Sequence, residues 1–205
     1  TQYDPDLLGH LEAQIANAAD ELAYTAHDLD DGLRSGLLQP EQLDGVSLWE
    51  MAKENIACPE GHFNELTRHM LIRRIIGIEV RDLAATTAAA IGASAVQNPL
   101  DIQNLGHNVV TWSDSMSTMN RELKTFLYEH LYRHFRVVRM SEKAENFIAQ
   151  LYTAYVTEPD QLPPSATAQI KSYGLQRAVC DYIAGMTDRF ALDEYAKLFD
   201  PHTRP

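Results

Sequence analysis

The side chains best placed to do chemistry share one stripe of the first predicted helix. At about 100° per residue, Asp20, Tyr24 and Asp28 fall within an arc of about 100°, together with His27 and Asp31. The carboxylates repel one another, so a metal ion, a substrate or a basic partner would offset the cost of gathering them. Carboxylate oxygens bind divalent cations and accept hydrogen bonds from hydroxyl groups.

The alternative for this stripe is a solvated acidic face, which is the commoner origin of such a pattern. Tyr24 argues against it, because a solvated face rarely needs an aromatic ring at its centre. His27 and Asp28 form a His-Asp dipeptide, but neighbouring helical residues diverge by about 100° and rarely coordinate one ion together. The stripe is therefore a candidate site for a metal or a hydroxyl-bearing substrate.

Most familiar site motifs are absent from the sequence. It has no Walker A phosphate loop, no GxGxxG, HExxH or GxSxG motif, and no Glu-x-x-His pair of the di-iron helical bundles. Cys58 and Cys180 lie too far apart for a Cys-x-x-Cys site, which favours a reducing cytoplasm. The uncharged stretch 83–100 is too polar to cross a bilayer, so we expect a cytoplasmic protein without a membrane segment.

Charge is distributed unevenly along the chain. Residues 1–65 hold 14 acidic residues against Arg34 and Lys53, which disfavours a nucleic-acid-binding surface there. A later basic cluster fits either phosphate binding or a solvated helix face. Its members are Arg121, Lys124, His130, Arg133, His134, Arg136 and Arg139.

Helical periodicity recurs along the chain and strand-like alternation is scarce, which predicts an all-α protein of six or seven helices. One apolar stripe defines the first helix, over 7–29, and consists of Leu11, Ile15, Ala18, Leu22, Ala26 and Leu29. Further helices are expected over 46–56, 63–91, 115–135, 141–156 and 166–199, the last interrupted near Gly185.

The pattern makes three more specific predictions about these helices and the segments between them. The pattern over 63–91 directs Leu66, Met70, Ile75 and Ile78 toward a core. Ser141 is expected to cap the N-terminus of the helix that follows it. Residues 92–110 are expected to form a loop.

Three stretches of the sequence resemble the bacterial deoxyguanosinetriphosphate triphosphohydrolase-like proteins of the HD-domain superfamily. They read EAQIANAADELAYTAHDLDDGLRSGLL over 12–38, FLYEHLYRHFRVVRM over 126–140 and VCDYIAGMTDRFALDEYAKLF over 179–199. The three stretches occur in the same order as in the family and are distributed over most of the length of the chain. The resemblance implies a multi-helix HD-domain-like bundle, of which this chain would be the C-terminal portion.

In this family a His, a His-Asp pair and a later Asp hold a divalent metal. The resemblance matches the last ligand to Asp20, and the other ligands would precede Thr1. It implies that 1–40 is the last helical segment of the HD catalytic core and 41–205 a C-terminal helical domain. The metal would be Mg, Mn, Co or Fe, since carboxylate and imidazole ligands suit several. We expect the chain alone to hold no metal tightly and to be inactive, because one carboxylate cannot retain a transition metal.

The resemblance also assigns substrate-binding residues. Tyr24 and Asp28 match positions that face the nucleotide sugar, where a carboxylate accepts a hydrogen bond from the 3′-hydroxyl and a tyrosine fills the space of a 2′-hydroxyl. The segment TRHMLIRR is similar to part of the vertebrate dNTP hydrolase with SAM and HD domains, and matches Arg68 to an arginine that contacts phosphate. The alternative for Arg68 is a surface helix arginine. Arg73 and Arg74 are expected at the surface or an interface.

The expected activity is metal-dependent hydrolysis of a deoxynucleoside triphosphate, in the family dGTP, to the deoxynucleoside and triphosphate. The resemblance implies that the metal and residues preceding Thr1 activate water against the α-phosphorus. It also implies that the partners are the N-terminal segment of the same protein and further copies in a homo-oligomer. The alternative is a non-enzymatic helical module for oligomerisation or regulation.

Overall fold

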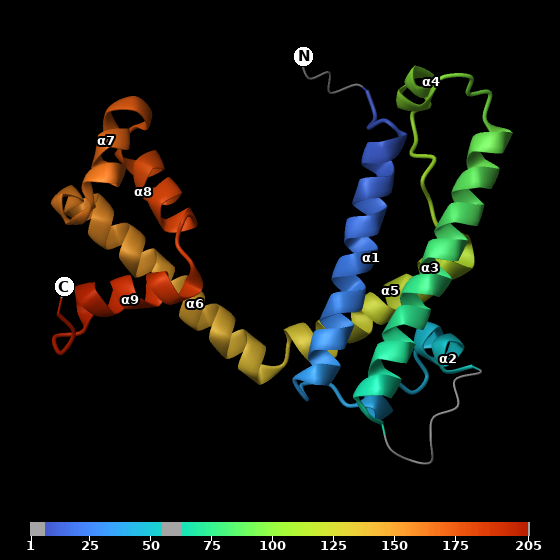
Figure 1. Cartoon of the computed structure of the whole chain (residues 1–205), viewed down its shortest axis with the longest axis horizontal. Helices are drawn as coiled ribbons and strands as arrows, with labels where there is room; N and C mark the ends of the chain where they lie inside the picture. The colour runs from blue at the N-terminus through green and yellow to red at the C-terminus, as the bar shows by residue number, and fades with distance from the viewer. Residues whose placement is uncertain (1–6, 55–62, 205) are drawn as a thin grey trace. The chain divides into compact units, whose positions relative to one another are not determined.

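The computed structural model describes residues 7–54 and 63–204, and every regular element in these ranges is helical. This confirms the predicted all-α fold. The chain forms two compact units, one up to His134 and one from Phe135 onward (Figure 1). The predicted domains 1–40 and 41–205 rest on the family resemblance and stay a prediction.

The first unit contains five α-helices among its described residues: α1 Leu11–Arg34, α2 Ser47–Lys53, α3 Glu65–Ala93, α4 Pro99–Gln103 and α5 Asp114–Leu127. A turn of π-helix, Tyr128–Tyr132, continues α5 and is called the π-helical turn below. The second unit contains α6 Phe135–Thr157, α7 Pro164–Tyr173, α8 Leu175–Ala184 and α9 Asp188–Phe199. Short 3-10 turns occupy Pro40–Leu43 and Pro159–Gln161.

The helices α1 and α3 lie side by side in the first unit (Figure 1). The predicted apolar stripe of α1 is buried in its second half, where Leu22, Ala26 and Leu29 enter the core, whereas Ile15 near its start is 46% exposed. Each fully buried leucine contributes about 1.5–3 kcal/mol relative to an exposed one. The second half of α1 is thus firmly fixed in the unit.

The start of α5 is tied to α3 by a carboxylate. Asp82 of α3 accepts hydrogen bonds from the Ser113 backbone N–H (2.9 Å) and hydroxyl (2.6 Å). The same Ser113 hydroxyl caps α5 by accepting from the Met116 N–H at 3.2 Å. Leu123 and Leu127 of α5 are then fully buried in the core shared with α1 and α3. This packing fixes the position of the π-helical turn that follows.

The prediction of which α3 residues face the core is partly wrong. Ile75 is buried as expected, but Leu66 is 67% and Met70 43% exposed, and Leu71 and Ile72 are buried instead. Apolar residues surround much of the circumference of α3, so the periodicity does not identify a single face. The packing against α1 selects the face that carries Leu71 and Ile75.

Several predicted helix boundaries differ from the structure. Ser141 lies inside α6, so its predicted capping role is wrong, because the residues before it contain no helix breaker and the helix begins at Phe135. The predicted loop 92–110 contains α4, which Asn98 caps by accepting from the Leu100 N–H. The predicted interruption near Gly185 is confirmed. A second break, at Gly174 with φ +82°, separates α7 from α8.

The second unit packs around α6, α8 and α9. Leu151, Tyr155 and Val179 are buried at its centre. The Tyr155 hydroxyl donates a hydrogen bond to Glu194 Oε2 at 3.0 Å, which satisfies the polar end of a buried aromatic ring. Burial and this contact raise the pKa of the Tyr155 phenol, so it stays a donor.

Candidate functional site

The predicted stripe forms on α1 as one line of side chains spaced by a helical turn. Asp20 and Tyr24 are exposed, Tyr24 by 62%, and Asp28 is half-buried. An exposed tyrosine between two carboxylates is accessible to a ligand from solution. The gradient in exposure arises because the C-terminal half of α1 lies against α5 and the π-helical turn.

Asp28 is held by a residue that the sequence analysis missed. The Tyr132 hydroxyl, at the end of the π-helical turn, donates a hydrogen bond to Asp28 Oδ2. Burial raises the pKa of the Tyr132 phenol well above its usual range, and Asp28 and Tyr24 add to this effect. The phenol therefore stays protonated at neutral pH and lies close to two of the predicted sugar-binding residues.

Asp20, the predicted metal ligand, is one exposed carboxylate on α1. Among residues 7–54 and 63–204, no group of three or more His, Cys, Asp or Glu side chains could hold a metal ion. Catalytic metal sites generally use three or more protein ligands. The described residues alone therefore do not complete a divalent metal site, and the role of Asp20 as a metal ligand stays a prediction.

Arg68 lies in the interior of the first unit, so the surface alternative for this residue is wrong. It is 4% exposed and forms an ion pair with Asp30 of α1. A second guanidinium nitrogen lies 3.7 Å from Glu65 Oε1. Asp30 and Asp28 diverge by about 160° around α1, so the structure does not bring Arg68 to the Asp28 side of the stripe. Its phosphate role stays a prediction.

The next two arginines of α3 differ in exposure. Arg73 is exposed, as expected for a surface or interface residue. Arg74 is half-buried, and its buried Nε has no hydrogen-bond partner among the described residues. The expected surface or interface position therefore fits Arg73 better than Arg74.

A buried carboxylate on α3 also escaped the sequence analysis. Glu79 is 2% exposed, and its Oε2 has no hydrogen-bond partner in the part of the chain that the structure describes. Burial raises the pKa of Glu79 to about 7, against a lowering effect of Lys124 and a raising effect of Glu21. Lys124 forms an ion pair with Glu21, which joins α5 to α1. The sequence pattern did not indicate this burial, because Glu79 is one of several charged residues along α3.

Two members of the predicted basic cluster have structural roles. Lys124 pairs with Glu21, and the His130 ring stacks on Phe126 with centroids 4.4 Å apart. The division between the two units falls within the cluster, with Arg136 and Arg139 in the second unit. Its phosphate role stays a prediction.

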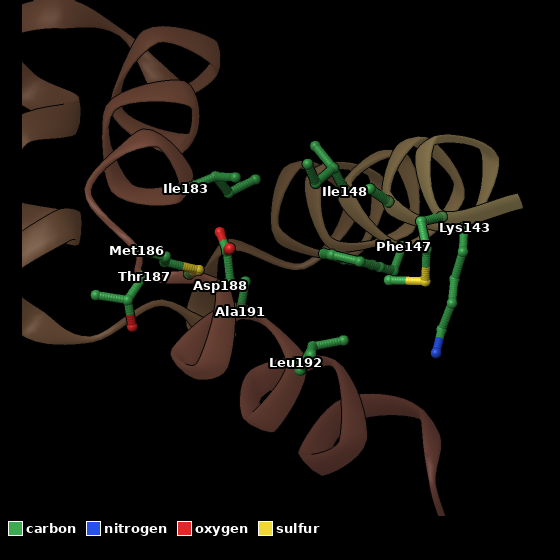
Figure 2. A pocket seen from close by; sticks show the side chains of 11 residues that line it. Lys143, Phe147, Ile148, Ile183, Met186, Thr187, Asp188, Ala191 and Leu192 are labelled. Atoms are coloured by element: carbon green, nitrogen blue, oxygen red, sulfur yellow. The ribbon is translucent and has the colours of Figure 1, made fainter. Parts of the chain in front are cut away.

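The second unit contains an apolar cavity of about 270 Å³ between α6 and the α8–α9 turn (Figure 2). Phe147, Ile148, Met186 and Leu192 contribute apolar walls, and Asp188 is a charged group at the start of α9. No predicted site residue lines this cavity.

None of the helices in the described ranges is both long and apolar enough to span a membrane.

Comparisons with known proteins match nearly the whole chain. The model of the phosphohydrolase-associated domain matches residues 110–197. A deoxyguanosinetriphosphate triphosphohydrolase-like protein of Geobacter sulfurreducens is 45% identical over 98% of this chain and 52% of its own length. A protein with the same description from Deinococcus deserti is 44% identical over 98% of this chain and 53% of its own length. Another, from Nitrosomonas europaea, is 39% identical over 94% of this chain and 52% of its own length. The chain spans about half the length of the curated relatives it matches.

Proposed function

We infer the function from one premise: the chain belongs to the family of deoxyguanosinetriphosphate triphosphohydrolase-like proteins. We propose that it supplies the C-terminal part of a metal-dependent enzyme that hydrolyses a deoxynucleoside triphosphate to the deoxynucleoside and triphosphate. dGTP is the proposed substrate, because the relatives' shared name specifies it.

The single observation that carries this proposal is the accessible stripe of Asp20, Tyr24 and Asp28 on α1. Asp28 offers a carboxylate to the 3′-hydroxyl of the sugar, and the exposed Tyr24 ring lies one turn away, where it can fill the space of a 2′-hydroxyl. A preference for deoxyribose over ribose follows. A solvated acidic face would not require the aromatic ring or the contact that fixes Asp28.

Asp20 is proposed as one ligand of a divalent metal. The described residues alone do not complete a metal site, so the remaining ligands would come from the part of the protein that corresponds to the other half of its relatives. The 205-residue chain is therefore expected to release no triphosphate by itself, whereas the full-length protein is expected to do so.

The test is product analysis with the full-length protein. Each of the four dNTPs is incubated with the protein and Mg²⁺ or Mn²⁺, and the products are separated by ion-exchange chromatography. The proposal predicts equal amounts of deoxynucleoside and triphosphate, with dGTP the best substrate. Absence of triphosphate with all four dNTPs would refute it and favour the non-enzymatic helical module.

A matched pair of variants tests the site itself. Asp28→Ala should weaken dGTP binding by about 1–3 kcal/mol, the range for a lost hydrogen bond to a charged group. Asp31→Ala removes an exposed carboxylate from the same stripe, whose partner Arg34 lies 3.7 Å away at the surface, and should leave binding nearly unchanged. Equal effects of the two substitutions would contradict the assignment of Asp28.

A further inference from the structure

The carboxylate of Asp28 is held from outside its own helix. Its partner Tyr132 lies 104 residues further along the chain, and the phenol donates to Oδ2. We propose that Tyr132 is a positioning residue, whose hydroxyl keeps Asp28 in the orientation that accepts the 3′-hydroxyl of a deoxynucleotide. This inference rests on the proposed function and extends it to a residue outside the α1 stripe.

The backbone around Tyr132 is arranged to reach Asp28. In the π-helical turn the Arg133 N–H donates to the Tyr128 carbonyl at 3.1 Å, a wider ring than that of an α-helix. Leu131 in this turn is buried and anchors it in the core. The turn therefore presents Tyr132 to α1 from a fixed position.

A glycine on α1 makes this close approach possible. Gly32 lies one helical turn after Asp28, and a Cβ at this position would lie 3.3 Å from Leu131 Cδ1 and 2.6 Å from Leu38 Cδ1. Any larger residue would push against both leucines. The absence of a side chain at Gly32 thus lets the π-helical turn pack beside Asp28.

The chemistry of the contact leaves Asp28 available to a ligand. A carboxylate accepts several hydrogen bonds on its two oxygens, so donation to Oδ2 leaves Oδ1 free to accept another. The raised pKa of Tyr132 keeps its proton on the phenol, so it acts as a donor at neutral pH. Fixing the carboxylate before substrate arrives lowers the entropic cost of binding.

The experiment compares Tyr132→Phe, which removes only the hydroxyl, with the matched control Tyr128→Phe in the same turn. Tyr128 is 57% exposed, so loss of its hydroxyl should have no effect. In the full-length protein, Tyr132→Phe should raise KM for dGTP about tenfold and change kcat by less than about twofold. The second ligand is 2′,3′-dideoxyguanosine triphosphate, measured as a competitive inhibitor, because it lacks the 3′-hydroxyl.

The inhibition constant of the dideoxynucleotide distinguishes positioning from a structural role. If Tyr132 acts through Asp28 on the 3′-hydroxyl, Tyr132→Phe leaves this constant unchanged. An equal loss of affinity for both nucleotides would overturn the inference, as would an unchanged KM for dGTP. The Asp28→Ala background gives a second check, because Tyr132→Phe should have no further effect on KM there.

The outcomes for the inference and for the proposed function are separable. Wild-type protein that hydrolyses dGTP while Tyr132→Phe behaves like Tyr128→Phe refutes only the positioning role. Wild-type protein without activity on any dNTP refutes the proposed function, and the positioning role with it. Thermal unfolding of each variant checks that the fold is retained.

Discussion

Replacing Glu79 with glutamine should stabilise the first unit at neutral and alkaline pH. Glu79 is 2% exposed, has an unpartnered Oε2 among the described residues and has a pKa raised from 4.5 to about 7. The folded state therefore holds this proton more tightly than the unfolded state does. Stability is lost as pH rises from about 4.5 to about 7, and the loss is complete above that range.

The size of the effect follows from the pKa difference. Each pKa unit corresponds to about 1.4 kcal/mol, so a rise from 4.5 to about 7 costs about 3 kcal/mol at pH 8. Glu79→Gln keeps the shape of the side chain and removes the ionisation. The variant should match wild type near pH 4.5 and exceed it by up to about 3 kcal/mol at pH 8.

Urea unfolding followed by tryptophan fluorescence can measure this difference. Both tryptophans of the chain, Trp49 and Trp112, pack in the core of the first unit, so the signal reports on the unit that contains Glu79. Glu41→Gln removes an exposed glutamate of the same unit and serves as the control. A stability difference between Glu79→Gln and wild type that does not change with pH would refute the reasoning.

Three further predictions concern the site and its supports. Gly32→Ala should destabilise the first unit by about 1–3 kcal/mol through contact with Leu38, and urea unfolding should show it; unchanged stability would mean that the leucines move aside freely. Arg68→Met should cost about 1.5–3 kcal/mol by removing the ion-pair partner of the partly exposed Asp30, and unchanged stability would contradict a stabilising ion pair. Tyr24→Ala should reduce the preference for dGTP over GTP in steady-state kinetics, and an unchanged ratio would remove Tyr24 from the sugar site.

The sequence predicted the fold class, the family and the stripe on α1, because each depends on local periodicity or on long matching stretches. The core face of α3 was predicted incorrectly at Leu66 and Met70, since the apolar residues of this helix lie around much of its circumference and packing against neighbouring helices selects the buried face. The sequence periodicity could not identify Tyr132 as a partner of Asp28, because the two residues are 104 positions apart in the chain.

The burial of individual charged side chains could not be predicted from the sequence either. Glu79 and Arg68 look like ordinary charged residues of a surface helix, and only the packing of α3 in the first unit shows that both are almost fully buried. The short helix α4 was missed for a different reason. Its Asn98-Pro99 start resembles a turn, and five residues carry too little periodicity to predict a helix.

The most direct test of the central claim compares full-length wild-type protein with Asp20→Asn. Two quantities are measured for each protein, the turnover of dGTP and the content of bound metal. Asp20→Asn keeps the shape of an exposed side chain but removes the negative charge that a metal ligand needs. Loss of a residue that only supports a metal ligand costs 10–100-fold, so loss of a ligand should lower turnover by more than about a hundredfold and release the metal. Wild-type turnover and metal content in Asp20→Asn would contradict the account.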